Sequence, residues 1–483
     1  MIYGPLIAIM KTDKPDRRYH MKSKHATKED NSTIISDEIQ TSEHNKIHIV
    51  CLFIIGLIIG SAYHFTQPTA IYKNGLVYEA VEYRKMILQS AEKKTLSARK
   101  PFVYRSFLPI LAGTTCRITK IDPQQIIMTY NFIFGLAGYL FFVMLCLKII
   151  QNRALVYILG ILYLSNYFVP FRFGTFYPFY VDPPAAFFSV LLLYLHCKWD
   201  RLTPLRLGFA SILALLGVWT REYVLVSVLA STAAHRVLFF PDKKHIVKIT
   251  EPTQFALGFI PVITAIITLI IVHKSVIPTP ASQEYTYTFL GHALFSINYK
   301  LWNPHNLLIP AFVCYGPFLL TGLLLNRRTL RNILDHPMLL LFGIGIFILA
   351  VLGGSHTERF FFWGAPAYLP FLGLMLLDEN NSIPKNTIIV LCVILLLQLI
   401  ATRAFFPLPN ARGLVANSIP EFLFLAPYGK NIHYFHIWTY EMPASTKKIL
   451  LLEYFFLIVP VLGFRFFIRM RRFNSCQSPH TGR

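Results

Sequence analysis

The sequence predicts an all-α, polytopic integral membrane protein with about 12 transmembrane helices, and three observations indicate this class. The chain has 483 residues, of which 54% are hydrophobic and only 14% are charged. Its mean hydropathy is +0.49. The apolar residues fall in long runs that short basic loops separate. Together these features exclude an ordinary soluble domain, in which about a quarter of the residues are charged.

The expected membrane spans follow one another along the chain. Several are shorter than the roughly 20 residues that a full crossing needs. Proline bounds some of these short spans, as after Pro183 and Pro184. Such segments are typical of helices that line a cavity. We place the spans at residues 49–65, 126–150, 155–171, 185–196, 205–219, 223–240, 255–272, 307–325, 338–352, 360–377, 387–401 and 449–468.

Composition divides the chain into three parts. Residues 1–48 are polar and rich in Lys, Asp, Ser and Thr, and they are predicted to be a disordered cytoplasmic segment. Residues 49–468 are the transmembrane domain, with a first extracytoplasmic loop at 66–125. Residues 469–483 form a basic cytoplasmic tail. The apolar start at 2–10 is too short, and lacks the basic flank, for a cleavable signal peptide.

The basic residues predict the orientation. Net charge is +22, but these residues are spread over the termini and short loops, which argues against nucleic-acid binding. Alternate short connections hold single arginines, namely Arg172, Arg221 and Arg359. The positive-inside rule therefore puts both termini in the cytoplasm and the loop at 66–125 outside. The inner set is Lys148, Arg153, Lys198, Arg201, Arg206, Arg236, Lys243, Lys244, Lys248, Arg327, Arg328, Arg331 and Lys385, with Arg465, Arg469, Arg471 and Arg472 in the tail.

Neither cysteine spacing nor internal symmetry adds a further site. The seven cysteines show no C-x-x-C pair, so they predict neither a disulfide framework nor a zinc site. No spacing of His, Asp and Glu identifies ligands for a divalent metal, so the cofactor stays unknown. No internal repeat is visible, and the inverted repeats common in transporters therefore receive no support.

The first outer loop is predicted to contain an amphipathic surface helix. Apolar residues recur there at helical spacing. Glu79 and Glu82 fall on the opposite, polar face. Arg84 falls within the apolar stripe, where its long side chain can reach lipid headgroups. We therefore expect a helix that lies on the bilayer and presents two carboxylates, followed by Arg99 and Lys100. The stripe consists of Val77, Ala80, Val81, Ile87, Leu88 and Ala91.

Three further charged motifs are predicted on the same outer face as Glu79, Glu82 and Arg105. They contain Asp182 in 180–184, Arg221 and Glu222 in 219–223, and His356, Glu358 and Arg359 in 356–359. A charge near the apolar zone is costly and needs a partner or a function. One interpretation is a shared polar site. The alternative is that Arg221 with Glu222, and Glu358 with Arg359, form ion pairs that lock helix ends.

The order of these motifs resembles a known family. After the first span come P-F-V-Y-R-S-F-L-P-I-L-A (101–112), V-D-P-P-A-A (181–186), W-T-R-E-Y-V-L (219–225) and T-E-R-F-F-F-W-G-A-P-A-Y-L-P-F-L (357–372). Over residues 49–377 the chain resembles the polyprenyl-phosphate-sugar-dependent membrane glycosyltransferases of the GT-C superfamily, particularly bacterial members. The resemblance implies sugar transfer from a polyprenyl-phosphate carrier on the extracytoplasmic face. It also implies an acidic catalytic base in the first outer loop.

The chain departs from this family at the expected acidic position, which Asn74 and Gly75 occupy. An amide is not a general base, so Glu79, Glu82 or Asp182 would take that role, and we favour Glu79. Arginine suits the lipid phosphate through charge-assisted, bidentate hydrogen bonds, and the candidates are Arg105, Arg221 and Arg359. Arg99 and Lys100 would hold the carrier headgroup or simply anchor the chain to lipid. Glu222, His356 and Glu358 complete the predicted substrate-binding set.

The resemblance implies partners and a location. The partners are membrane lipid, a polyprenyl-phosphate-linked sugar and a glycan, lipid or protein acceptor, in the bacterial inner membrane. A transporter or flippase of a lipid-linked or anionic solute would use the same arginines without a catalytic base. A non-catalytic membrane scaffold is the third alternative, which Asn74 favours.

Overall fold

The structure is a computed structural model that forms two compact units, Met1–Ile47 and His48–Arg483. In the first unit the described residues belong to α1 (Lys28–Thr66). α1 thus begins inside the segment 1–48 that was predicted to be disordered. Residues 28–48 contain neither Pro nor Gly, and an existing helix extends into such a segment at little cost. The described residues are 28–67, 69, 79–199, 201–232, 237–239, 247–249, 252–279, 289–324, 327–353, 357–377, 383, 391–392, 394–399, 447–448, 451–452, 454–456, 458–459 and 463.

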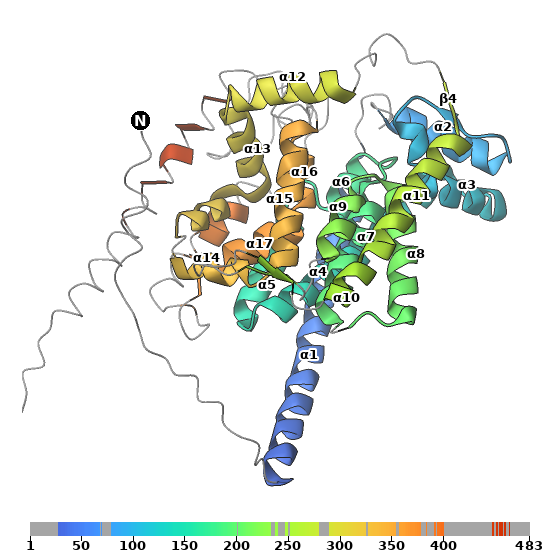
Figure 1. Cartoon of the computed structure of the whole chain (residues 1–483). Helices are drawn as coiled ribbons and strands as arrows, with labels where there is room; N and C mark the ends of the chain where they lie inside the picture. The colour runs from blue at the N-terminus through green and yellow to red at the C-terminus, as the bar shows by residue number, and fades with distance from the viewer. Residues whose placement is uncertain are drawn as a thin grey trace, which may run out of the picture. The chain divides into compact units, whose positions relative to one another are not determined.

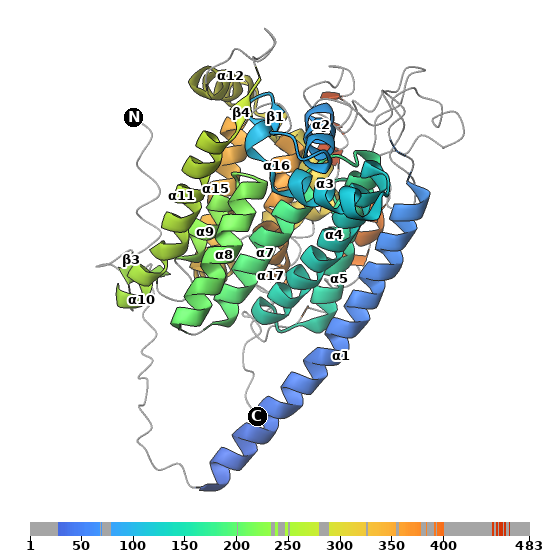
Figure 2. The same cartoon turned by 90° about the vertical axis from the view of Figure 1, so that its right-hand side faces the viewer.

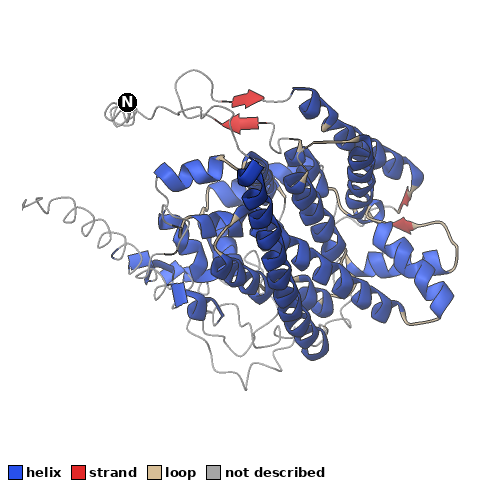
Figure 3. Ribbon diagram, turned by 90° about the horizontal axis from the view of Figure 1, so that it is seen from below, coloured by secondary structure: helices blue, strands red, loops and turns tan. Residues whose placement is uncertain are grey.

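Helices dominate the second unit, as Figures 1 and 3 show, and its strands form only short pairs among the described residues. After α1 the helices are α2 (Ala80–Ala91), η3 (Phe102–Tyr104), α3 (Phe107–Thr119), α4 (Pro123–Ile149), α5 (Arg153–Ser165), α6 (Pro170–Phe176), α7 (Asp182–Lys198), α8 (Pro204–Thr220), α9 (Val224–Ser231), α10 (Pro252–Leu257), α11 (Phe259–Ser275), α12 (Phe289–Leu301), α13 (His305–Tyr315), η5 (Gly316–Leu324), α14 (Arg327–Leu334), α15 (Pro337–Leu352), α16 (Thr357–Trp363) and α17 (Ala365–Leu374). β1 (Ser97–Ala98) pairs in parallel with β4 (Ile277–Pro278), and β2 (Val237–Phe239) pairs antiparallel with β3 (Val247–Ile249).

Four helical segments are long and apolar enough to cross a membrane: Asn45–Thr66, Pro123–Ile149, Arg153–Phe176 and Pro252–Ser275. Shorter apolar helices span Pro204–Thr220, Pro337–Leu352 and Ala365–Leu374. These findings, made on the described residues, confirm the predicted class of helical membrane protein. The total of about 12 spans stays a prediction.

The central helices pack closely beneath the charged motifs. In Figure 2, α4, α7, α8 and α9 run side by side. The helices α4, α8 and α9 each contact α7. Gly217 near the end of α8 allows this approach, because a Cβ there would meet Val224 Cγ1 at 2.6 Å and Phe188 Cβ at 3.2 Å. Gly217 therefore lets the end of α8, and with it Arg221, lie against α7 and α9.

Two predicted spans differ from the structure. In the span expected at 223–240, α9 ends at Ser231 and residues 237–239 form β2. Val-Leu-Phe in β2 and Val-Lys-Ile in β3 are strand-forming sequences. The span expected at 307–325 begins as α13 and continues as the 3₁₀ helix η5. Gly316, at φ 50°, ends the α-helix there.

The first-loop helix exists, but the face that it presents was predicted wrongly. α2 packs on α3 and buries Ala80, Tyr83, Met86 and Ile87, together with Glu82. Arg84 is exposed, together with Val81 and Leu88 of the predicted apolar stripe. Both glutamates are 7% exposed and do not lie on an open polar face. The reason is that α3 offers a second apolar surface. Gly113 allows close contact there, since a Cβ would collide with the Ile87 carbonyl.

Candidate active site

Asp182 is fixed at the start of α7. It is the first residue of that helix, and prolines follow it in the first turn, where a missing N–H is tolerated. Val181 is the N-cap, and no side chain caps the helix. Asp182 is 8% exposed, so its carboxylate is buried at a helix N-terminus, where the helix dipole favours negative charge.

Two arginines reach Asp182 from helix ends far apart in the sequence. Arg221 directly follows α8, and its extended backbone (φ −164°, ψ 136°) turns the chain toward α9. Arg359 is the third residue of α16. The arginines are 7% and 3% exposed, so both guanidinium groups are buried with their partners.

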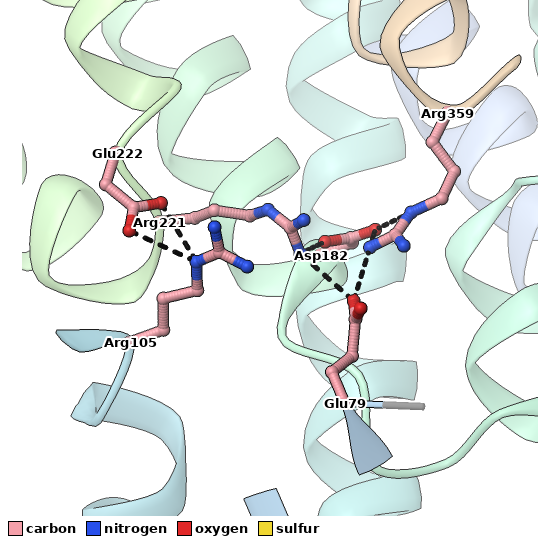
Figure 4. Close-up of polar contacts among 6 residues, drawn as sticks. All are labelled: Glu79, Arg105, Asp182, Arg221, Glu222 and Arg359. Carbon is pink, nitrogen blue, oxygen red and sulfur yellow. Dashed lines mark hydrogen bonds and ion pairs between the residues drawn. The ribbon is translucent and has the colours of Figure 1, made fainter. Parts of the chain in front are cut away.

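Glu79 brings a second carboxylate to these arginines, as Figure 4 shows. It is the N-cap residue of α2, but its side chain does not cap that helix. Instead Glu79 Oε1 accepts a hydrogen bond from Arg359 Nη2 at 3.0 Å, and Arg221 Nη1 lies 3.8 Å away. Glu79, Asp182, Arg221 and Arg359 are named the shared cluster below.

Within the shared cluster, Asp182 bonds to both arginines. Its Oδ2 accepts from Arg359 Nε at 2.9 Å and from Arg359 Nη2 at 2.6 Å. Its Oδ1 accepts from Arg221 Nη1. Arg359 therefore links both carboxylates, and the cluster has two positive and two negative side chains in one buried place.

Aromatic rings flank both guanidinium groups. The Trp363 ring centroid lies 4.8 Å from Arg221 Cζ and 5.9 Å from Arg359 Cζ. The Tyr180 ring centroid lies 4.8 Å from Arg359 Cζ. Tyr223 stacks on Trp363, with 4.0 Å between the two ring centroids. Sequence reasoning missed these three residues as site residues, although each stands inside or beside a quoted motif. Stacked rings hold the guanidinium planes in place.

Two other ion pairs lie outside the shared cluster. Glu82 accepts from Arg99 Nε at 2.6 Å and from the Arg99 backbone N–H at 3.0 Å. Arg105 Nε donates to both oxygens of Glu222, at 2.9 and 3.2 Å. The suggested pairing of Arg221 with Glu222 is therefore wrong, because each residue contacts a different partner. These two contacts are named the exclusive pairs.

Charges from both an exclusive pair and the shared cluster act on Tyr83, which is buried on α2. Burial raises the pKa of its hydroxyl to about 12, and nearby Arg105 opposes this while Glu79 adds to it. The phenol therefore stays neutral at physiological pH.

Of the remaining predicted site residues, Lys100 and Glu358 are not part of the shared cluster. Lys100 is exposed. Glu358 is fully buried, beside the cluster residue Arg359, and the charge of Glu358 acts on Lys300 and Lys447. His356 lies outside the described residues.

A small pocket borders the shared cluster. Its polar members are Asp182 and Arg359, and aromatic and proline side chains make up most of its wall. Among the described residues no group of three His, Cys, Asp or Glu side chains could hold a metal ion. The pocket is lined by Phe168, Pro170, Phe173, Asp182, Pro183, Ala186, Arg359, Phe362 and Trp363.

No protein-family model and no curated protein sequence matches the chain. Among solved structures, it is similar to the oligosaccharyltransferase of Archaeoglobus fulgidus in complex with zinc and sulfate, with a TM-score of 0.42 and 14% identity over 77% of this chain and 56% of that one. A second structure of that enzyme, tethered to an acceptor peptide with an NVT sequon, gives a TM-score of 0.42 and 13% identity over 74% and 54% of the two chains. The chain thus spans little more than half the length of the archaeal protein.

Proposed function

We propose that this chain is a membrane glycosyltransferase of the GT-C type, which moves a sugar from a polyprenyl-phosphate carrier to an acceptor. The observation that carries the proposal is the shared cluster, in which Glu79 and Asp182 meet on Arg359 in a buried place. Transfer from a lipid-linked sugar phosphate needs both a carboxylate base and cations for the leaving phosphate. The ordered motifs of the sequence support the same function, because the cluster residues belong to them or, for Glu79, to the first outer loop.

In this proposal Glu79 is the general base. Asp182 accepts three hydrogen bonds from the two arginines and therefore orients both guanidinium groups. Glu79 belongs to the first outer loop, where the resemblance to the GT-C glycosyltransferases implies the catalytic base, and its Oε1 accepts from Arg359 Nη2 at 3.0 Å. Glu79 therefore accepts the proton of the acceptor hydroxyl, and Asp182 orients the arginines. Asp182 is the competing candidate for the base.

Arg221 and Arg359 would bind the leaving lipid phosphate. A guanidinium that is shared between two carboxylates has donors in several directions, so an incoming phosphate can take the place of one carboxylate oxygen. Trp363 and Tyr180 keep the guanidinium planes aligned during this exchange. Arg105 was predicted to bind the phosphate, but it belongs to an exclusive pair. In this proposal Arg105 instead holds the chain just after α8 through its contact with Glu222.

The proposed reaction takes place on the extracytoplasmic face of a bacterial inner membrane. The positive-inside pattern supports cytoplasmic termini and an outer loop at 66–125, which contains Glu79. The partners are membrane lipid, the lipid-linked sugar donor and a glycan, lipid or protein acceptor.

The test is transfer by the purified chain in liposomes that contain one polyprenyl-phosphate sugar at a time, with radiolabel on the sugar. Stripped membranes of the source organism supply acceptors. We expect label to leave the carrier with at least one donor, and the Glu79→Gln/Asp182→Asn variant to lose this activity. Movement of labelled lipid between leaflets without transfer would replace the proposal by the flippase alternative.

A further inference from the structure

A buried lysine holds the ends of two helices together. Lys300, on α12, is fully buried, and its Nζ donates to the Ala350 carbonyl at 2.5 Å. One turn earlier on the same face, Ser296 Oγ donates to the Val351 carbonyl at 2.8 Å. Both carbonyls belong to the last turn of α15, where backbone acceptors have no partner within the helix. α12, which crosses the end of α15 in Figure 1, thus caps that helix.

Lys300 also interacts electrostatically with α16, the helix that follows α15 in the chain. Glu358 on α16 is fully buried, and its negative charge opposes the lowering of the pKa that burial causes at both Lys300 and Lys447. Lys447 in turn donates to Tyr299 Oη at 3.1 Å and to Asn306 Oδ1 at 3.2 Å. The charge of Glu358 therefore acts on lysines from two segments of the chain.

α16 is further fixed from α13. Cys314 Sγ donates to the Glu358 carbonyl at 3.3 Å, and Tyr315 Oη donates to the Phe361 carbonyl at 2.5 Å. Successive helical residues differ by about 100° in direction. Arg359 accordingly points to the shared cluster while Glu358 faces the lysines. A shift of α16 on the lysine side would move Arg359 on the cluster side.

We propose that Lys300 is a positioning residue for the transfer reaction: by capping α15 and facing Glu358, its protonated side chain fixes α16 so that Arg359 reaches Asp182 and Glu79. The inference rests on the proposed function for its catalytic consequence. Its structural part, the charge-dependent placement of α16, does not need that function.

The titration of Lys300 falls in a measurable range. Burial lowers the pKa of Lys300 to about 8, although Glu358 opposes this. The charged and titratable groups around it are Glu358 on α16, Lys447 near the C-terminus and His305 on α13, next to Lys447. Above pH 8 the lysine loses its charge, and we expect α16 to loosen and turnover to fall.

Global stability should follow the opposite trend. Between pH 8 and the ordinary lysine pKa of 10.5, the unfolded chain keeps a proton that the folded chain has released. The free energy of unfolding contributed by Lys300 therefore rises with pH in this window. A loss of turnover without a loss of stability distinguishes positioning from unfolding.

The experiment compares the full chain with Lys300→Arg, Lys300→Met and the control Lys274→Met, an exposed lysine at the end of α11. Turnover is measured from pH 6.5 to 10. We expect Lys300→Met to reduce turnover by up to about 100-fold, as small misplacements can do, and to flatten the descending limb of the pH profile. Lys300→Arg should restore turnover and move that limb to higher pH, while Lys274→Met should resemble the wild type.

Hydrogen exchange of the α16 amides at pH 7 and pH 9.5 gives a second readout. Exchange rates are corrected for intrinsic base catalysis, which an unstructured peptide measures at each pH. After this correction we expect the α16 amides to exchange faster at pH 9.5 than at pH 7 in the wild type, but not in Lys300→Arg. If the wild type transfers no sugar but shows this exchange pattern, the proposed function fails and the positioning role stands. An unchanged pH profile and unchanged exchange in Lys300→Arg would overturn the inference.

Discussion

The shared cluster and the exclusive pairs contain the same residue types in different arrangements. In the exclusive pairs, the ion pair among the described residues joins one arginine to one carboxylate, and one or both partners are partly open to water. The side chain of Glu222 is 34% exposed. In the shared cluster, Arg359 serves two carboxylates, and its four side chains are 4–11% exposed.

This difference indicates which charges can act in chemistry. A one-to-one pair is satisfied, and its removal changes local stability by a modest amount. A buried cluster with shared ligands is expensive to assemble, because desolvation opposes it, and it leaves donors that a ligand oxygen can take. Buried charges that share partners beside a pocket make a candidate functional site.

The largest effect is expected from Glu79→Gln. Glutamine still accepts from Arg359 but is not a base, so turnover should fall by roughly 10²–10⁴-fold. Donor binding should change little, since the base acts on the acceptor. Turnover and donor affinity are measured on the same preparations. Near-normal turnover here, with a collapse in Asp182→Asn, would move the base to Asp182.

Asp182→Asn should have the largest effect on stability. It leaves Arg221 and Arg359 with Glu79 as the remaining cluster carboxylate, and breaking one partner of a buried ion pair costs about 3–5 kcal/mol. Thermal unfolding in detergent, followed by near-UV circular dichroism, measures this change. The matched control is Glu222→Gln, which removes the more exposed acid of an exclusive pair. Equal losses in the two variants would erase the distinction between cluster and pair.

The smallest effect is expected from Glu82→Gln. Glu82 bonds to the side chain and backbone of Arg99, and glutamine retains an acceptor for one of these bonds. The loss should be below about 1 kcal/mol of stability, as for partly exposed ion pairs, with turnover close to that of the wild type. A large loss of turnover in this variant would return Glu82 to the list of catalytic candidates.

Much of the fold follows from composition and periodicity. Apolar length identifies candidate membrane spans at Asn45–Thr66, Pro123–Ile149 and Pro252–Ser275, because each segment is long enough and carries few charges. The face of α2 was mistaken because its pattern was judged against lipid and water alone. Packing on α3 supplies a third environment, and Gly113 gives no sign of this contact in the sequence.

The sequence predicted part of the candidate site, namely its charged residues, but not how they pair. Charge near an apolar zone singled out Asp182, Arg221 and Arg359, since such charges need partners. Which carboxylate meets which arginine depends on long-range geometry, and neighbours in sequence suggested the wrong pairing for Arg221 and Glu222. Trp363 was missed because a ring in an apolar run is ordinary, and only its place over Arg221 distinguishes it.

The binding of polyprenyl phosphate without sugar tests most directly whether the shared cluster, and not an exclusive pair, receives the lipid phosphate. Affinity is measured for the wild type, Arg221→Ala and Arg105→Ala at one fixed salt concentration. We predict a loss of about 1.5–3 kcal/mol for Arg221→Ala, roughly tenfold to a hundredfold in Kd, and wild-type affinity for Arg105→Ala. Equal affinities in the wild type and Arg221→Ala, or a larger loss in Arg105→Ala, would contradict the account.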